Sequence, residues 1–155
     1  MKKPHRNVSE ETAYELLKQV SVGALSMIDV NGLPYVTPVH AVYCPEDECL
    51  YFHCAPEGRR WEALHKNPAV CYVAVTSMEV VPDHFTTLYH SVMVNGHIEF
   101  IEDADDKRRT LIQMTETLVP GQLTKRPQVI DAFSGGMEMI RIKIDSITAK
   151  IKSDM

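Results

Sequence analysis

A histidine and two adjacent arginines stand at the junction between a strand-like segment and a helix-like segment. His53 lies near the end of an apolar run, and Arg59 and Arg60 follow it after the segment 55–58. A helix N-terminus presents unpaired N–H groups and a partial positive charge, and two guanidinium groups in its first turns add donors that suit a phosphate. Gly58 would let the backbone come close to a ligand. The spacing indicates a compact anion pocket, although solvated surface arginines are the simpler interpretation of the local pattern alone.

His53 itself is compatible with several roles. A histidine can donate to a ligand, bind a metal or act as a proton donor, and more often it is a hydrogen-bonded residue at a rim. The seven histidines show no H-E-x-x-H spacing and the four cysteines form no C-x-x-C pair, so we expect no metal site. Cys44 and Cys49 flank the turn 45–48 and could face each other across a hairpin, but small apolar side chains in strands are the favoured interpretation.

Motifs for covalent or nucleotide chemistry are missing from the chain. The sequence contains no G-x-S-x-G nucleophile elbow, no P-loop and no G-x-G-x-x-G turn. Ordinary hydrolases and nicotinamide enzymes of the Rossmann type are therefore disfavoured. If the protein is an enzyme, we expect a bound cofactor to carry the chemistry.

Length, charge and apolar runs limit the classes of partner. The 155 residues suit one domain, which we take as 1–155, and a chain with a net charge of -5 lacks the broad basic face that nucleic acid requires. The longest clean apolar run, 69–75, is too short to span a bilayer, and residues 1–11 contain no apolar signal-peptide core. We therefore expect no nucleic-acid or membrane partner, and a cytoplasmic location in which the thiols are reduced.

Local patterns predict the elements that position these residues. Ser9 and Asp103 each read as the cap of a helix, and Asn95-Gly96 inside a long apolar segment indicates a bulge. The prolines at 34 and 38 indicate an edge strand or a bulge. The expected helices are 9–19, Pro56 to about 67, and 103–118; the expected strands are 22–29, 34–43, 49–54, 70–81, 88–102 and 139–150, with mostly loop over 119–136. Strands joined by short turns, without βαβ alternation, predict an antiparallel sheet or barrel of the mainly β (α+β) class.

Four segments, taken in order, resemble a known family. They are Gly32-Leu33-Pro34-Tyr35-Val36-Thr37-Pro38-Val39, then Leu50-Tyr51-Phe52-His53-Cys54-Ala55-Pro56-Glu57-Gly58-Arg59-Arg60, then Asn67-Pro68-Ala69-Val70-Cys71, then Tyr89-His90-Ser91-Val92. Their order and spacing, over about residues 6–150, resemble the pyridoxamine 5'-phosphate oxidase-like superfamily of flavin-binding split barrels. Within it, the chain is most similar to the nitroimidazole-resistance (Nim) branch, whose members are also called flavin-nucleotide-binding proteins.

The resemblance implies a six-stranded antiparallel split β-barrel with about three peripheral helices, which works as a homodimer with FMN bound in a cleft between the subunits. The residues that it places at the cofactor are Pro38, Val39 and His40, with their backbone at the ring edge, Arg59 and Arg60 at the phosphate, Ser91 as a hydroxyl donor, and His53 nearby. Many relatives carry lysine at the position of Arg60; arginine keeps the charge and adds a bidentate fork.

The resemblance also implies an FMN-dependent reductase. We expect the flavin to accept two electrons from NADH, NADPH or another donor, and to pass them to a small acceptor such as a nitro-aromatic compound. His53 is the candidate catalytic residue, as a proton donor or a substrate-facing group, because a nitro group that gains electrons must also gain protons.

Three alternatives stay open. Oxidation of pyridoxamine 5'-phosphate itself needs a second cationic site, for which the chain offers Lys107-Arg108-Arg109 on a helix and Lys125-Arg126 in a loop. Haem binding would use His40, His53 or His90 as an axial ligand. A non-catalytic flavin carrier, sensor or storage protein needs the same pocket as a reductase, so the sequence does not separate these two.

Overall fold

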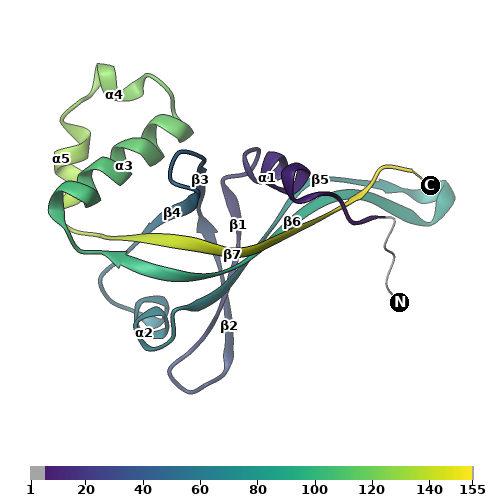
Figure 1. Cartoon of the computed structure of the whole chain (residues 1–155), viewed down its shortest axis with the longest axis horizontal. Helices are drawn as coiled ribbons and strands as arrows, with labels where there is room; N and C mark the ends of the chain where they lie inside the picture. The colour runs from purple at the N-terminus through teal and green to yellow at the C-terminus, as the bar shows by residue number, and fades with distance from the viewer. Residues whose placement is uncertain (1–5, 155) are drawn as a thin grey trace.

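The protein, described over residues 6–154 by a computed structural model, is a curved antiparallel sheet flanked by helices (Figure 1). In chain order the elements are α1 (Glu10–Leu17), β1 (Val22–Ile28), β2 (Pro34–His40), β3 (Val42–Cys44), β4 (Cys49–Cys54), α2 (Arg59–Lys66), β5 (Ala69–Val81), the 3-10 helix η2 (Pro82–His84), β6 (Thr86–Ile101), α3 (Ala104–Leu118), α4 (Gln122–Lys125), α5 (Val129–Ser134) and β7 (Glu138–Lys152). The first five residues, part of the segment on which the signal-peptide expectation rests, lie outside the described residues. Within the described part, no helix is long and apolar enough to cross a membrane.

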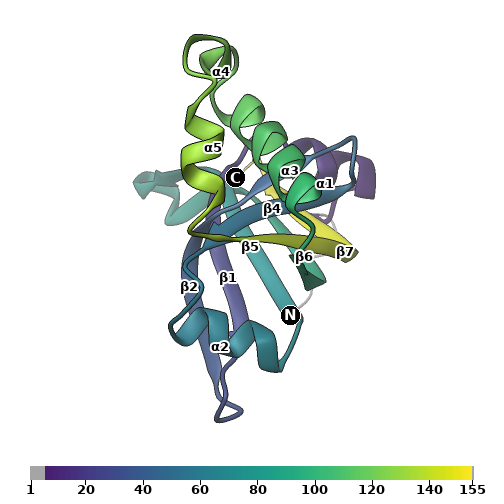
Figure 2. The same cartoon turned by 90° about the vertical axis from the view of Figure 1, so that its left-hand side faces the viewer.

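The strands form one sheet in the order β2-β1-β5-β6-β7-β4-β3, and every neighbouring pair is antiparallel. β2 and β3 stand at opposite edges of this sheet, yet only Ala41 separates them in the chain. The sheet must therefore curl until its two edges meet at this residue, and the curl is visible in Figure 2. The mainly β (α+β) class and the antiparallel pairing are confirmed, whereas closure into a split barrel stays a prediction.

The segment 34–43 is not the single strand that its pattern predicts. β2 pairs with β1 as far as His40, and β3 pairs with β4 from Val42, so the chain changes sheet edges at the fully buried Ala41. The expected six strands become seven, because the local alternation continues through a break that only the different partners of the two halves create. Pro34 and Pro38 lie on β2, which confirms the edge-strand expectation, since an edge strand can spare their N–H groups.

β5, β6 and β7 are the longest strands among the described residues, with 13, 16 and 15 residues. The β5–β6 hairpin and the end of β7 project from the body, away from α2 and α3, and we call this projection the arm (Figure 1). A register shift leaves Asp145 of β7 as an extra residue opposite Asn95 and Gly96, which confirms the predicted bulge. Glycine is needed there because a Cβ on Gly96 would lie 2.1 Å from the carbonyl oxygen of Lys143.

α1 and α3 begin after the predicted caps, α2 begins later than predicted, and α4 and α5 were not predicted. Ser9 and Asp103 each accept a hydrogen bond from a backbone N–H three residues further on. α2 begins at Arg59 rather than at Pro56, because Gly58 takes a φ of 102° and turns the chain into the helix. The segment 119–136, predicted as mostly loop, contains α4 and α5, so the expected three helices become five over residues 6–154.

Two apolar clusters hold these elements together. The larger lies inside the curl of the sheet, beneath α1 and α2, and the smaller lies between α3, α5 and the strands β3, β4 and β7. Ile130 of α5 is 3% exposed and joins Leu111 and Met114 of α3 in the smaller cluster, so packing on α3 orders a segment that its prolines and glycines mark as loop. Cys44 and Cys49 are cross-strand neighbours and free thiols in this cluster, as their apolar interpretation predicts.

Candidate functional site

The first turn of α2 and the ends of β2 and β4 enclose a pocket of about 280 Å³, which we call the arginine pocket. Its lining residues are Tyr35, Thr37, Cys54, Ala55, Glu57, Gly58, Arg59, Arg60 and Trp61. α2 has no capping side chain at Gly58, so its first N–H groups are open to a ligand. Glu57 also lines this pocket, and its negative charge repels an anion unless its carboxylate points to solvent. The structure therefore brings both predicted arginines to one concave surface.

Arg59 is already engaged by the protein. Its Nη2 lies 2.9 Å from Oδ2 of Asp29, and its guanidinium carbon lies 4.0 Å from the centre of the Tyr35 ring. Asp29 is 5% exposed and also accepts hydrogen bonds from the N–H groups of Asn31 and Leu33. The Leu33 N–H and the Arg59 guanidinium lower the pKa of the Asp29 carboxyl, so this carboxylate is charged at neutral pH. Arg59 thus joins the turn between β1 and β2 to α2.

Arg60 is the arginine that faces the pocket without an acidic partner. It is half-buried, its guanidinium carbon lies 5.8 Å from the centre of the Phe52 ring, and it forms no ion pair with any residue of the described range 6–154. The indole N–H of Trp61 is buried and has no acceptor within the same range. A guanidinium without an acidic partner, free helix N–H groups and an orphaned donor together fit a phosphate, which supplies several acceptor oxygens and negative charge.

A second pocket, of about 440 Å³, lies on the other side of β4, and we call it the histidine pocket. His40 from the end of β2 and His53 from β4 line it together with Ser21. Its remaining walls are mostly apolar side chains of α3, α5 and the segments beside them, namely Leu111, Met114, Thr115, Leu118, Val119, Val129, Ile130, Phe133 and Met137. His53 and Cys54 are consecutive residues of one strand and point to opposite faces, so β4 separates the two pockets.

The environment keeps the His53 imidazole neutral. Desolvation by the surrounding protein, the positive charge of Arg60 and the neighbouring His40 all lower the pKa of His53 from its ordinary value of 6.5. A neutral imidazole offers one N–H donor and one acceptor nitrogen to a molecule in the pocket. The two histidines and the apolar walls suit a small, flat, uncharged molecule with polar atoms at one end.

The other predicted cofactor residues fall in different places. Val39 is 4% exposed and belongs to the larger core, while Pro38 and His40 beside it are exposed on the edge strand β2. Contact of this backbone with a flavin ring stays a prediction. Ser91 lies on β6 and lines a third pocket with Tyr89 and Lys150, so one chain does not bring it to the arginines.

The chain's family is decided by its sequence over most of its length. A family model described as pyridoxamine 5'-phosphate oxidase matches residues 9–151. The chain belongs to the pyridoxamine 5'-phosphate oxidase family. Both the arginine pocket and the histidine pocket lie within the matched residues. No curated protein matches the chain.

Solved structures share the fold of this family member. A protein of Bacteroides thetaiotaomicron, described as a 5-nitroimidazole antibiotic resistance protein, is similar with a TM-score of 0.76 and 24% identity, over 94% of this chain and 86% of that one. A FAD- and haem-binding protein of Mycobacterium smegmatis has a TM-score of 0.79 and 17% identity, over 96% and 74%. A FAD-binding protein of Mesorhizobium loti has a TM-score of 0.69 and 23% identity, over 96% and 98%. At these identities the likeness shows a shared fold.

Asp29, Tyr35 and Trp61 are site residues of this family member that the sequence does not predict as such. The segment Asp29–Gly32 does carry a local signal, because an aspartate that bonds the N–H two residues on is typical of a turn. No local pattern predicts that its second oxygen holds Arg59, which lies 30 residues further along the chain.

Proposed function

We propose that the protein is an FMN-binding flavoprotein that reduces small acceptors such as nitro-aromatic compounds. The observation that carries this proposal is the adjacency of two pockets across β4: one with Arg60, which has no acidic partner, at a helix N-terminus, the other with two histidines among apolar walls. A flavin is a phosphate joined by a short chain to a flat, largely apolar ring. Membership of the pyridoxamine 5'-phosphate oxidase family, and structural neighbours described as FAD-binding, support the same class of cofactor.

In this proposal each residue has a distinct task. Arg60 and the N–H groups of α2 hold the phosphate, and Asp29 keeps Arg59 and the helix start in place. When bound, FMN supplies the two-electron chemistry, with NADH or NADPH as the electron donor. His53 offers its neutral ring N–H as a hydrogen bond to the oxygen of the acceptor on which negative charge develops. The α3 and α5 side chains keep water away from the acceptor.

We propose further that the protein is a homodimer. Val75, Met78 and Met93 are 59%, 67% and 42% exposed on the arm, where large apolar side chains gain by being covered. Ser91 lies between these residues and shares no pocket with the arginines of its own chain. A second subunit would bring Ser91 to a flavin held by its partner. We place the dimer in the cytoplasm, where free cysteines stay reduced.

The first experiment measures the cofactor. The purified protein is scanned by absorption spectroscopy, and the mass of the compound released by heat is determined; flavin bands and the mass of FMN are expected. FMN binding is then titrated in the apoprotein. Arg60→Ala should weaken it about tenfold to a hundredfold, the loss of a charge-assisted contact. Arg126→Ala, which removes the same charge from an exposed residue, is the matched control. Equal affinities for the two variants would remove Arg60 from the site.

Turnover separates a reductase from a flavin carrier or sensor, since both need the same pocket. The holoprotein is supplied with NADH or NADPH and a nitro-aromatic acceptor, and His53→Ala should lower kcat while leaving FMN bound. Absence of turnover with every donor and acceptor pair would favour the carrier. For the oxidase alternative, Arg108 lies 3.2 Å from Asp131 and Arg109 lies 2.9 Å from Asp106 in exposed ion pairs, and an oxidase assay with pyridoxamine 5'-phosphate tests it.

Haem binding is the second candidate, and one observation favours it. His40 and His53 line the same largely apolar pocket, an arrangement that suits axial ligation, whereas His90 does not line it. Structural neighbours from Mycobacterium smegmatis and Azotobacter vinelandii are described as a haem-binding protein and a flavocytochrome. The same absorption spectrum decides between the candidates, because haem shows an intense Soret band and flavin does not.

A further inference from the structure

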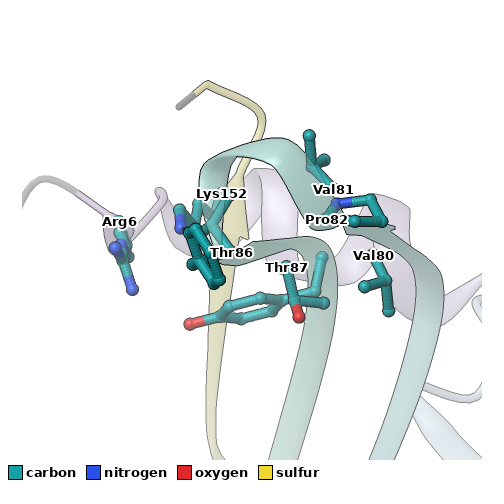
Figure 3. A pocket seen from close by; sticks show the side chains of 9 residues that line it. Arg6, Val80, Val81, Pro82, Thr86, Thr87 and Lys152 are labelled. Carbon is teal, nitrogen blue, oxygen red and sulfur yellow. Dashed lines mark hydrogen bonds between the residues drawn. The ribbon is translucent and has the colours of Figure 1, made fainter.

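The end of the arm carries a cationic pocket that is separate from the arginine pocket. A pocket of about 600 Å³ lies there, lined by Arg6, Lys152, Tyr89, two threonines and the apolar residues of the β5–β6 turn, and we call it the arm pocket (Figure 3). It shares no residue with the arginine pocket or the histidine pocket. The β5–β6 turn that lines it lies at the opposite end of the molecule from α2 (Figure 1).

Three strands build the floor of the arm pocket. Val80 of β5 is directly opposite Thr87 of β6, and Tyr89 of β6 is directly opposite Lys152 of β7. Directly opposed residues of antiparallel strands present their side chains on the same face, and so do residues two apart on one strand. An apolar group, a hydroxyl, a phenol and an ammonium therefore share one surface.

The N-terminal segment adds a second cation to this surface. Asn7 forms a bridge with Lys150 of β7, and the N–H of Val8 donates to the carbonyl oxygen of Ala149 at a distance of 3.3 Å. This pairing runs antiparallel to β7, so Arg6 comes beside the end of the strand that carries Lys152. Figure 3 shows Lys152, Thr86 and Thr87 between Arg6 on one side and Val80 and Pro82 on the other.

The charges of the arm pocket are not balanced. Over residues 6–154, neither Arg6 nor Lys152 forms an ion pair, and the ammonium of Lys152 donates only to the hydroxyl of Thr86. Arg6 Nε is buried and has no acceptor in the same range. A buried donor without an acceptor is costly, and an anion with several oxygens would satisfy it together with the neighbouring ammonium and hydroxyl groups.

The rim of the arm pocket is apolar and strained. Phe85 is 99% exposed and takes a left-handed backbone conformation, with φ of 47° and ψ of 42°. Such a conformation is unfavourable for a bulky residue, and water around a free phenyl ring adds to the cost. Val80, which lines the same pocket, is 62% exposed. A flat ring stacked on Phe85 would cover both side chains.

We propose that the arm pocket binds a small organic phosphate with a planar ring, of the nucleotide class, through Arg6 and Lys152 at the phosphate and Phe85 at the ring. The arm pocket shares no residue with the arginine pocket or the histidine pocket, and Tyr89 is the one residue that it shares with the pocket of Ser91. The proposal assigns a ligand to charges that the rest of the protein leaves uncompensated.

The test is titration calorimetry of the full-length protein, saturated with FMN, with ADP as the probe. Lys152→Ala and Arg6→Ala should each weaken ADP binding about tenfold or more, the loss of a charge-assisted contact. Lys150→Ala is the matched control, since Lys150 lies on the same face of β7 but does not line the arm pocket. Thermal melting of each variant confirms that the fold is intact. No ADP binding to the wild type at millimolar concentration, or equal losses for Lys152→Ala and Lys150→Ala, would overturn the proposal.

Three further titrations locate the ligand. Arg60→Ala should leave ADP binding unchanged, whereas its loss would show that ADP uses the flavin pocket and would overturn the assignment. Phe85→Ser should weaken ADP binding and leave the binding of inorganic phosphate unchanged, because only the ring contact is removed. If the variant instead dissociates a dimer and leaves ADP binding unchanged, a second copy of the chain covers this rim and the proposed ring contact is wrong.

Discussion

Arg59 and Arg60 show that neighbouring residues of the same type can have different tasks. Successive positions of a helix point about 100° apart, so the two guanidinium groups leave α2 in different directions. Arg59 reaches the buried Asp29 and the face of Tyr35, and Arg60 turns toward Phe52 and the arginine pocket. The first therefore contributes to the fold, whereas the second is the one available to a ligand.

This difference predicts opposite phenotypes for the two arginine variants. Arg59→Ala should lower the melting temperature, because it leaves the buried carboxylate of Asp29 without its guanidinium partner. Arg60→Ala should leave the melting temperature of the apoprotein nearly unchanged and affect FMN binding instead. Differential scanning calorimetry of both apoproteins checks this. A larger loss of stability for Arg60→Ala would contradict the assignment.

His53 predicts a specific dependence on pH. Because partial desolvation, the charge of Arg60 and the neighbouring His40 lower its pKa in the folded chain, the unfolded chain binds the proton more tightly. The free energy of unfolding should therefore fall as the pH drops below the ordinary histidine pKa of 6.5, and it should level off once the folded form is also protonated. His53→Gln should remove this part of the slope.

The imidazole titration is measured directly by NMR. The midpoint of the His53 resonance should lie below 6.5, and Arg60→Gln should move it upward because a positive neighbour is removed. His84→Gln is the control, since substitution of a different histidine must leave the His53 resonance in place. A His53 midpoint that is the same in Arg60→Gln and the wild type would mean that the two side chains do not interact.

At the scale of elements, bulges and glycines set the course of the long strands. The extra Asp145 of β7 sits opposite Asn95 and Gly96, and the backbone of Lys143 approaches Gly96 too closely for any Cβ. Bulges bend and twist a strand locally, which helps this sheet to curl until β2 and β3 come together. The same three strands then continue beyond the body as the arm.

The close approach at Gly96 predicts a large cost for a small change. Gly96→Ala should lower the free energy of unfolding by about 1–3 kcal/mol, since the neighbouring backbone must move to make room. Gly136→Ala is the control, because a Cβ there meets no atom within 4 Å. Urea denaturation of the two variants gives the comparison. Equal stabilities would show that the strand pairing yields easily at this point.

At the scale of the whole molecule, the functional groups are dispersed along the sheet. The arginine and histidine pockets lie on either side of β4, while Ser91 and the exposed Val75, Met78 and Met93 lie on the arm. Within one chain the arm lies apart from these two pockets, so the arm could meet them only in a dimer. The architecture is thus consistent with the proposed dimer.

Light scattering coupled to size-exclusion chromatography tests the dimer. The wild type should elute with twice the chain mass of 17.5 kDa. The double variant Val75→Glu, Met93→Glu should elute with the mass of one chain, because each subunit would bury two charges in the interface. Val30→Glu, at an exposed valine in the turn between β1 and β2, is the control. A wild-type monomer, or a double variant that remains dimeric, would contradict this assembly.

The sequence by itself determined the mainly β class, the positions of most strands, the caps at Ser9 and Asp103, the bulge at Asn95-Gly96, and the placing of Arg59 and Arg60 at a helix start. These features depend on residues within a few positions of one another, so periodicity and turn residues predict them. Only the tertiary structure decided the break at Ala41, the ordering of α5, the capture of Arg59 by Asp29, and the separation of Ser91 from the arginines. Each of these depends on contacts between residues far apart in the chain, and a local pattern does not predict which distant partner a strand or side chain will contact.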